Sequence, residues 1–147
     1  MSEPSTDSAG EGAGEMGSHG ARARGIVVGH GDMAQGLVDA VRRIAGEAGQ
    51  SLTAVSNEGR GPEELEAALE AVTGEGPAVV FVDLESGSCG IAAAYACRAR
   101  SERVVVCGVN LPMLLDFVFH RELPLAELVE RVIERGRAAI RAKPVPR

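Results

Sequence analysis

The chain has 147 residues, a formal net charge of −6 and aromatic residues at only 3% of its length. This length suits one domain rather than two. An acidic chain with so few rings is a poor candidate for binding nucleic acid or for stacking sugars against aromatic walls. A core built from aliphatic residues and alanine is typical of a parallel sheet covered by helices.

The two ends of the chain differ in composition from the part between them. Residues 1–23 are rich in Ser, Gly, Glu and Ala without apolar periodicity, which predicts a disordered tail. We expect one folded domain over residues 24–143 and a short C-terminal tail over residues 144–147. Because no apolar segment resembles a signal peptide or a membrane helix, we expect a cytoplasmic protein without membrane insertion. Three cysteines without metal-ligand spacing are expected to be buried free thiols: Cys89, Cys97 and Cys107.

Between these ends, short apolar runs alternate with amphipathic segments. The predicted elements are, in chain order, a strand at 26–28, a helix at 33–45, a strand at 52–55, a helix that begins at Pro62, a strand at 77–82, a helix at 91–98, a strand at 104–106, and helices at 113–119 and 125–142. The first helix is expected to place one apolar face on the core, formed by Leu37, Val38, Val41 and Ile44. This alternation predicts an α/β fold with an open, mostly parallel four-stranded sheet that is doubly wound by its helices.

Polar side chains follow three of the predicted strands. His30 follows the first strand, Asp83 the third and Asn110 the fourth. In open parallel sheets, ligands bind beyond the carboxyl ends of the strands, where the strand order reverses. Neighbouring strands lie about 4.8 Å apart, so these side chains can touch. A carboxylate that accepts a hydrogen bond from one imidazole nitrogen leaves the other nitrogen with a free lone pair.

Such a histidine can act as a base, a nucleophile or a metal ligand. With no second metal ligand expected beside it, we favour nucleophile or base and expect no metal. Small residues with accessible amides surround the pair, among them Gly31, Gly87 and Ser88. Amides at the start of a helix bind phosphate, so the combination with a histidine points to phosphoryl transfer. The alternative is that His30 and Asp83 are ordinary turn residues.

A second motif competes for the first glycine loop. Gly29-x-Gly31-x-x-Ala34 fits the dinucleotide-binding pattern and lies between a predicted strand and a predicted helix. Against this interpretation, His30 would crowd a bound pyrophosphate. The first acidic candidate for the ribose, Glu58, also lies beyond the expected spacing of about 20 residues. A small dinucleotide-binding module is therefore the weaker alternative.

Two segments carry a family resemblance that extends over residues 25–143. Residues 108–114, G-V-N-L-P-M-L, and residues 28–31, V-G-H-G, resemble the mannose-family enzyme IIA domain of the phosphoenolpyruvate-dependent sugar phosphotransferase system. The resemblance implies that His30 is the phosphorylated residue, that Asp83 orients its imidazole, and that Asn110 supports the site. It also implies phosphotransferase activity through a phosphohistidine, with no cofactor.

The resemblance further implies the partners. An HPr-type phosphocarrier would donate the phosphoryl group, a IIB component would receive it, and a membrane permease of the IIC/IID type would act downstream. The family usually has glycine and proline where this chain has Ser86 and Cys89. These departures keep open a regulatory phosphoprotein that passes nothing on to sugar.

A homodimer is also implied by the resemblance. Apolar residues that form either a dimer surface or ordinary core are Leu111, Met113, Leu114, Phe117 and Phe119. The arginines of the last helix are expected on a solvated face, namely Arg131, Arg135, Arg137 and Arg141.

Overall fold

A computed structural model describes residues 21–147, and its centre is a sheet of four parallel strands. The strands are β1 (Arg24–Gly29), β2 (Leu52–Ser56), β3 (Ala78–Val82) and β4 (Arg103–Cys107). They lie in the order β2-β1-β3-β4, and all three neighbouring pairs are parallel. The predicted α/β fold class is confirmed, and the sheet is entirely rather than mostly parallel.

The two central strands owe their place to their unbroken apolar runs. In β1 every residue from Gly25 to Gly29 is buried, and in β3 every residue is buried. The edge strands β2 and β4 expose part of their length. A strand that is buried on both faces must be apolar at every position, whereas an edge strand can carry polar residues.

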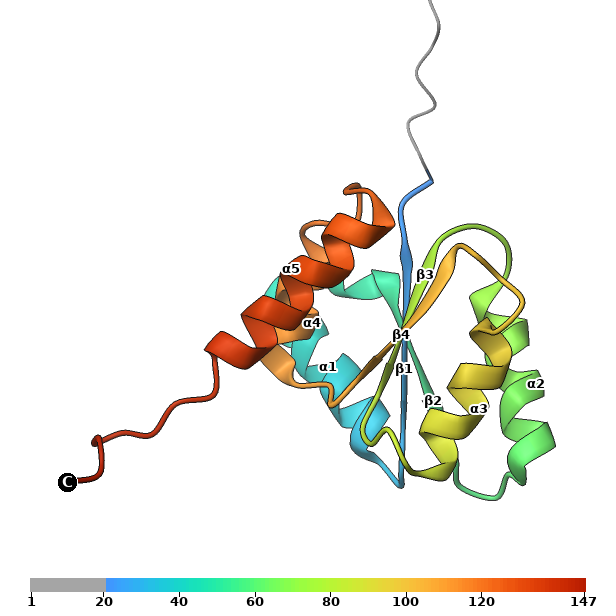
Figure 1. Cartoon of the computed structure of the whole chain (residues 1–147), viewed down its shortest axis with the longest axis horizontal. Helices are drawn as coiled ribbons and strands as arrows, with labels where there is room; N and C mark the ends of the chain where they lie inside the picture. The colour runs from blue at the N-terminus through green and yellow to red at the C-terminus, as the bar shows by residue number, and fades with distance from the viewer. Residues whose placement is uncertain (1–20) are drawn as a thin grey trace, which may run out of the picture.

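Helices cover both faces of the sheet (Figure 1). On one face lie α1 (Met33–Ala45), α4 (Leu111–Val118) and α5 (Leu125–Ala138), and a short 3₁₀ helix, η1 (Gly46–Ser51), links α1 to β2. On the other face lie α2 (Pro62–Thr73) and α3 (Ser88–Cys97). Each face has its own core, and the ring pair Phe81–Phe117 packs edge to face at 5.1 Å in the first of them.

Several predicted details are wrong at the ends and faces of helices. In α1 the buried stripe is Ala34, Val38 and Val41, while Ile44 is 63% exposed. The stripe continues through Ala45, which packs on the core, and Ile44 lies beside it. Helix α5 ends at Ala138 rather than at residue 142. The exposure of Ile140 explains the shorter helix, because nothing packs against a further turn.

The core on the face covered by α1, α4 and α5 accounts for most of the apolar residues considered for a dimer. Met113, Leu114 and Phe117 are buried core, whereas Phe119 is 58% exposed. Arg131 is exposed as predicted, like the other three arginines of the predicted last helix, but it is also paired. Its guanidinium donates two hydrogen bonds to the carboxylate of Asp116 in α4, at 2.9 and 3.2 Å. This ion pair joins the two helices.

Three expectations concern other parts of the chain. The predicted tail over residues 1–23 lies for the most part outside the described residues, which begin at Ala21. Among the helices of residues 21–147, none has the length and apolar character needed to cross a bilayer. Of the three cysteines, Cys89 and Cys97 are buried free thiols as expected, but Cys107 is exposed at the end of an edge strand.

Candidate functional site

The structure brings His30 and Asp83 together at the carboxyl edge of the two central strands. The chain passes from β1 to β2 on one side and from β3 to β4 on the other, so the strand order reverses between β1 and β3. Asp83 Oδ2 lies 2.7 Å from His30 Nδ1 and also accepts a hydrogen bond from the His30 backbone N–H at 2.8 Å. The side chain of Asp83 is 7% exposed and that of His30 is 44% exposed. A buried carboxylate therefore holds a ring that remains open to solvent.

Three hydrogen bonds determine the charge of this carboxyl group. Burial on its own raises the pKa of Asp83, but the two bonds from His30 and a third from the Leu84 N–H to Oδ1 at 2.9 Å outweigh it. The pKa of Asp83 therefore lies below its ordinary value, and the group is a carboxylate at neutral pH. Because a carboxylate only accepts hydrogen bonds, Nδ1 of His30 must carry the proton. The Nε2 atom is then left with its lone pair.

The start of α3 lies beside this lone pair. Ser88 Oγ is 3.4 Å from His30 Nε2. Gly87 precedes the helix, and a Cβ atom there would lie 3.0 Å from His30 Cε1, so a side chain would push the ring outward by a few tenths of an ångström. The first hydrogen bond of the helix runs from the Ile91 N–H to the Gly87 carbonyl at 3.1 Å. The amides of the three residues before Ile91 are left without an acceptor within the helix.

Helix α3 begins three residues earlier than the sequence predicts, at Ser88 rather than Ile91. The reason is a close contact between the loop after β3 and the first turn of the helix. A Cβ atom at Gly90 would lie 2.6 Å from the Leu84 carbonyl oxygen and 2.8 Å from the Glu85 carbonyl carbon. This contact packs the loop after β3 onto the first turn of α3, and it brings the positive end of the helix dipole to the histidine.

Asn57 is a site residue that the sequence analysis did not single out. Its Oδ1 accepts a hydrogen bond from the Gly31 N–H at 3.3 Å, and its Nδ2 donates to Ser88 Oγ at 3.5 Å. Asn57 follows β2, which lies next to β1 in the sheet. A search for polar residues after every predicted strand, the second included, would have found it.

The loop that holds His30 is secured by two hydrogen bonds to the end of β2. Gly31 has a φ of +56°, a conformation that favours glycine. Its carbonyl accepts a hydrogen bond from Ser56 Oγ at 2.9 Å. Together with the bond from its N–H to Asn57, this attaches the residue after His30 to the end of β2.

Asn110 lies at the same edge of the sheet but serves another part of the fold. Its Oδ1 accepts a hydrogen bond from the Met113 N–H at 3.1 Å and so caps α4. Its Nδ2 donates to the Gly136 carbonyl in α5 at 2.9 Å. One polar group thus bonds α4 and the other bonds α5, so the side chain joins the two helices. Neither group is directed at His30.

Cys89 lies on the inner side of the histidine ring. Its Sγ is 3.8 Å from His30 Nδ1, and the residue is fully buried. Burial and the negative charge of Asp83 raise the pKa of the Cys89 thiol, opposed in part by a hydrogen bond with Ser88. Ligand atoms of His30, Asp83 and Cys89 all lie within 4.8 Å of one another. The expectation that no second metal ligand lies beside His30 is therefore wrong.

These contacts define what the site can do chemically. A ring nitrogen with a free lone pair faces solvent, its protonated partner nitrogen is held by a carboxylate, and a serine hydroxyl with unpaired helix amides lies beside it. A nucleophile with anion-binding groups next to it suits the capture of a phosphoryl group.

Comparisons with known proteins identify the family of the chain. Residues 24–133 match the EIIA-man family, described as the PTS system fructose IIA component. The mannose/sorbose specific IIA subunit of the phosphotransferase system from Enterococcus faecalis has a similar structure, with a TM-score of 0.75 and 25% identity, over 86% of this chain and 98% of that one. No curated protein matches the chain.

A second solved structure shares the fold. The phosphotransferase system component EIIA from Streptococcus agalactiae superposes with a TM-score of 0.75 at 23% identity, over 82% of this chain and 96% of that one. The match to the family covers most of the chain, and it agrees with the resemblance carried by residues 28–31 and 108–114. The chain belongs to the EIIA-man family of the sugar phosphotransferase system.

Proposed function

We propose that the protein is a phosphoryl carrier that accepts a phosphoryl group on Nε2 of His30 from an HPr-type phosphocarrier and passes it to a IIB component. The observation that carries the proposal is the 2.7 Å contact between His30 Nδ1 and Asp83 Oδ2. It fixes the proton on Nδ1 and so keeps the lone pair on the nitrogen that faces solvent.

The transfer forms one bond and breaks another. The Nε2 lone pair of His30 attacks the phosphorus of the donor's phosphohistidine, while the donor's N–P bond breaks and its electron pair returns to the donor ring. The His30 ring gains positive charge as the new N–P bond forms. Asp83, already charged and already in contact, stabilises that charge without reorganising.

Other groups at the edge would hold the phosphoryl oxygens. Ser88 Oγ is the nearest hydroxyl to Nε2, at 3.4 Å, and the free amides of the first turn of α3 lie beside it. Gly87 leaves room for the ring, and Gly31 gives the loop its positive φ. The same groups would serve onward transfer to a histidine of the IIB component, because that transfer is the same displacement in reverse.

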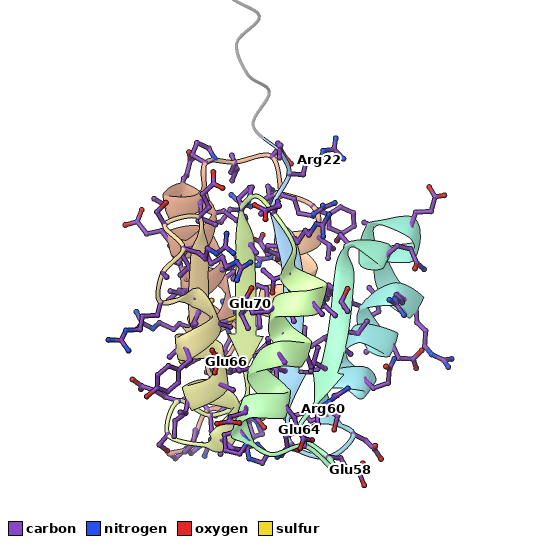
Figure 2. The ribbon with its side chains drawn as sticks, turned by 90° about the vertical axis from the view of Figure 1, so that its right-hand side faces the viewer. Arg22, Glu58, Arg60, Glu64, Glu66 and Glu70 are labelled. Atoms are coloured by element: carbon purple, nitrogen blue, oxygen red, sulfur yellow. The ribbon has the colours of Figure 1, made fainter. Side chains whose placement is uncertain are left out.

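Partner docking at this edge would be influenced by charge. Helix α2 has two acidic side chains in its first turn, and Figure 2 shows one of them, Glu64, near Glu58 at the same end of the molecule as the site. A basic face on the phosphocarrier would speed the encounter more than it would strengthen the complex. We place this exchange in the cytoplasm, upstream of a membrane permease of the IIC/IID type.

A phosphorylation assay tests the proposal. The protein is incubated with phosphoenolpyruvate, enzyme I and HPr, and intact mass is measured. We expect an increase of one phosphoryl group that is labile in acid. The group should be absent in His30→Ala and present in a control such as His120→Ala, whose histidine contacts Asp116 instead. No adduct, or an adduct that survives in His30→Ala, would contradict the assignment.

Two further measurements separate the alternatives. A chase with a IIB domain removes the label from a carrier, whereas a regulatory phosphoprotein keeps it; the replacements at Ser86 and Cys89 are the reason for considering this second function. Binding of NAD that persists in His30→Ala would instead favour the dinucleotide interpretation.

Sedimentation tests the homodimer, for which the exposed Phe119 is the remaining apolar candidate on α4 and its C-terminal cap.

A further inference from the structure

The thiol of Cys89 has no role in the phosphoryl transfer described above, yet it contacts the reactive ring. It comes from the first turn of α3, whereas His30 follows β1 and Asp83 follows β3. Three separate segments of the chain thus direct a sulfur, a nitrogen and a carboxylate oxygen at one point. Two of these groups also lie deep: Cys89 is fully buried and the side chain of Asp83 nearly so.

We propose that His30 Nδ1, Asp83 Oδ2 and Cys89 Sγ form a Zn²⁺ site, and that occupancy of this site prevents His30 from accepting a phosphoryl group. Thiolate, imidazole and carboxylate are the three ligand types that zinc takes from proteins. Mg²⁺ and Ca²⁺ prefer all-oxygen sites, so the sulfur selects against them. Three protein ligands leave a fourth position for water on the open side of the ring.

Of the three distances between ligand atoms, that between Sγ and Nδ1 already suits zinc and the other two must change. Bonds of about 2.0–2.1 Å to nitrogen and 2.3 Å to sulfur in a tetrahedron separate those two ligands by roughly 3.6 Å. The observed Sγ to Nδ1 distance is 3.8 Å. The Nδ1 to Oδ2 distance of 2.7 Å must open by roughly 0.6 Å, because a hydrogen bond is shorter than the separation of two zinc ligands. The half-exposed ring can make that movement. All three ligand atoms lie within 4.8 Å of one another, and zinc requires Sγ and Oδ2 to approach to about 3.6 Å.

Binding is balanced in charge and in protons. Three bonds form, from zinc to Nδ1, Oδ2 and Sγ. The thiol proton of Cys89 goes to solvent, and the proton displaced from Nδ1 is replaced by one on Nε2. A divalent ion with one thiolate and one carboxylate leaves the site neutral. This neutrality offsets the cost of ionising a buried thiol beside Asp83.

The shift of the ring proton connects the metal to the proposed function. With zinc on Nδ1, the neutral imidazole carries its proton on Nε2, so the lone pair needed for attack on phosphorus is gone. Asp83 is also occupied by the metal and cannot stabilise the ring. This consequence rests on the proposed phosphoryl transfer, whereas the metal site itself does not.

Cobalt tests the site without any phosphorylation. Titration of the metal-free protein with Co²⁺ should produce the near-ultraviolet charge-transfer absorption of a cobalt–thiolate bond. Cys89→Ser should abolish it, and the matched variant Cys107→Ser, which alters an exposed thiol, should retain it. Mg²⁺ should not compete. Absence of the band in the wild type, its survival in Cys89→Ser or its loss in Cys107→Ser would each overturn the proposal.

A second variant guards against misfolding of Cys89→Ser. His30→Gln changes a half-exposed side chain and should lower zinc affinity, measured by calorimetry, by at least about tenfold. Unchanged affinity in His30→Gln would also overturn the site. Far-ultraviolet circular dichroism checks that each variant retains its helices.

Phosphorylation with and without Zn²⁺ then tests the consequence. Labelling of the wild type should fall in zinc and return on chelation. Labelling of Cys89→Ser, expressed relative to its own metal-free level, should not fall. Equal inhibition of the wild type and Cys89→Ser would show that zinc acts on HPr or enzyme I. It would overturn the proposal that zinc inhibits through this site. If the wild type takes no label even without metal, the proposed function is refuted but the zinc site is not. The cobalt spectrum tests the site independently of phosphorylation.

Discussion

At the scale of single residues, the two oxygens of Asp83 have different tasks. Oδ2 accepts two hydrogen bonds from His30, and Oδ1 accepts one from the Leu84 N–H. Every group around the carboxylate is therefore a donor. An amide in its place must direct its NH₂ group at one of these donors, whichever way it is turned.

Asp83→Asn should therefore lower the rate of phosphorylation at His30 by roughly 10²-fold or more, while leaving the fold intact. If the NH₂ group faces His30, the wrong ring tautomer is stabilised, and if it faces Leu84, the loop there loses its hydrogen bond. In both cases the negative charge that stabilises the phosphorylated ring is lost. Single-turnover labelling from phospho-HPr measures the rate. A rate within about twofold of the wild type would show that Asp83 does not orient the ring.

The same carboxylate should make stability depend on pH. Its folded-state pKa is lowered, so the unfolded state binds the proton more tightly. The stabilisation is complete above the unfolded-state pKa of about 3.9 and is lost as the pH falls through the lower folded-state pKa. Urea unfolding of the wild type and Asp83→Asn should show a gap in free energy at neutral pH that narrows below about pH 4. A gap of constant size would contradict this prediction.

At the scale of elements, the start of α3 depends on one glycine. The carbonyls of Leu84 and Glu85 occupy the space that a side chain at Gly90 would need. These are backbone atoms, so they cannot rotate away as the end of a flexible side chain can. The position of the helix terminus beside His30 thus depends on close packing of the preceding loop against Gly90.

Gly90→Ala should destabilise the protein by about 2 kcal/mol or more, because the new methyl group displaces the loop after β3. It should also slow phosphorylation by moving Ser88 away from Nε2. The matched control is Gly36→Ala in α1, where an added Cβ atom meets nothing within 4 Å. That change should stabilise the fold by roughly 0.5–1 kcal/mol. Chemical denaturation measures both, and equal effects would refute the packing argument.

At the scale of the whole molecule, Arg103 fastens the face formed by α2 and α3 to the sheet. This first residue of β4 has a side chain that is 3% exposed. Its guanidinium donates to Glu70 Oε1, to the Ala96 carbonyl and to the Gly74 carbonyl, each at 2.8 Å. One side chain thus reaches α2, α3 and the turn that follows α2.

Arg103→Met should cost about 2 kcal/mol of unfolding free energy, because two carbonyls and a carboxylate lose a charged donor. The control is Arg100→Met, whose partner Glu75 is at 4.0 Å on the open surface. Exposed pairs of this kind contribute little, so its effect should stay within about 0.5 kcal/mol. Thermal and urea unfolding measure both variants. A larger loss in Arg100→Met would refute the role of Arg103.

The order of elements and the meeting of His30 with Asp83 could be predicted from the sequence, because apolar runs mark the strands and parallel strands end at one edge. The exact neighbours of the ring could not. Asn57 joins the site only because β2 lies next to β1, and Cys89 does so only because α3 begins early. Asn110 follows a strand as expected, yet the packing of α5 against α4 takes its amide elsewhere. Strand order and packing between elements decide these contacts.

The direction of β1 has a practical consequence for laboratory design. The strand enters the sheet at Arg24 and leaves it at the edge that carries His30, so the chain before Arg24 joins the body at the opposite end (Figure 1). A support or reporter coupled before Arg24 would therefore leave the reactive ring facing bulk solution. Molecules immobilised in this way would form a uniformly oriented layer for surface-based measurements of partner exchange.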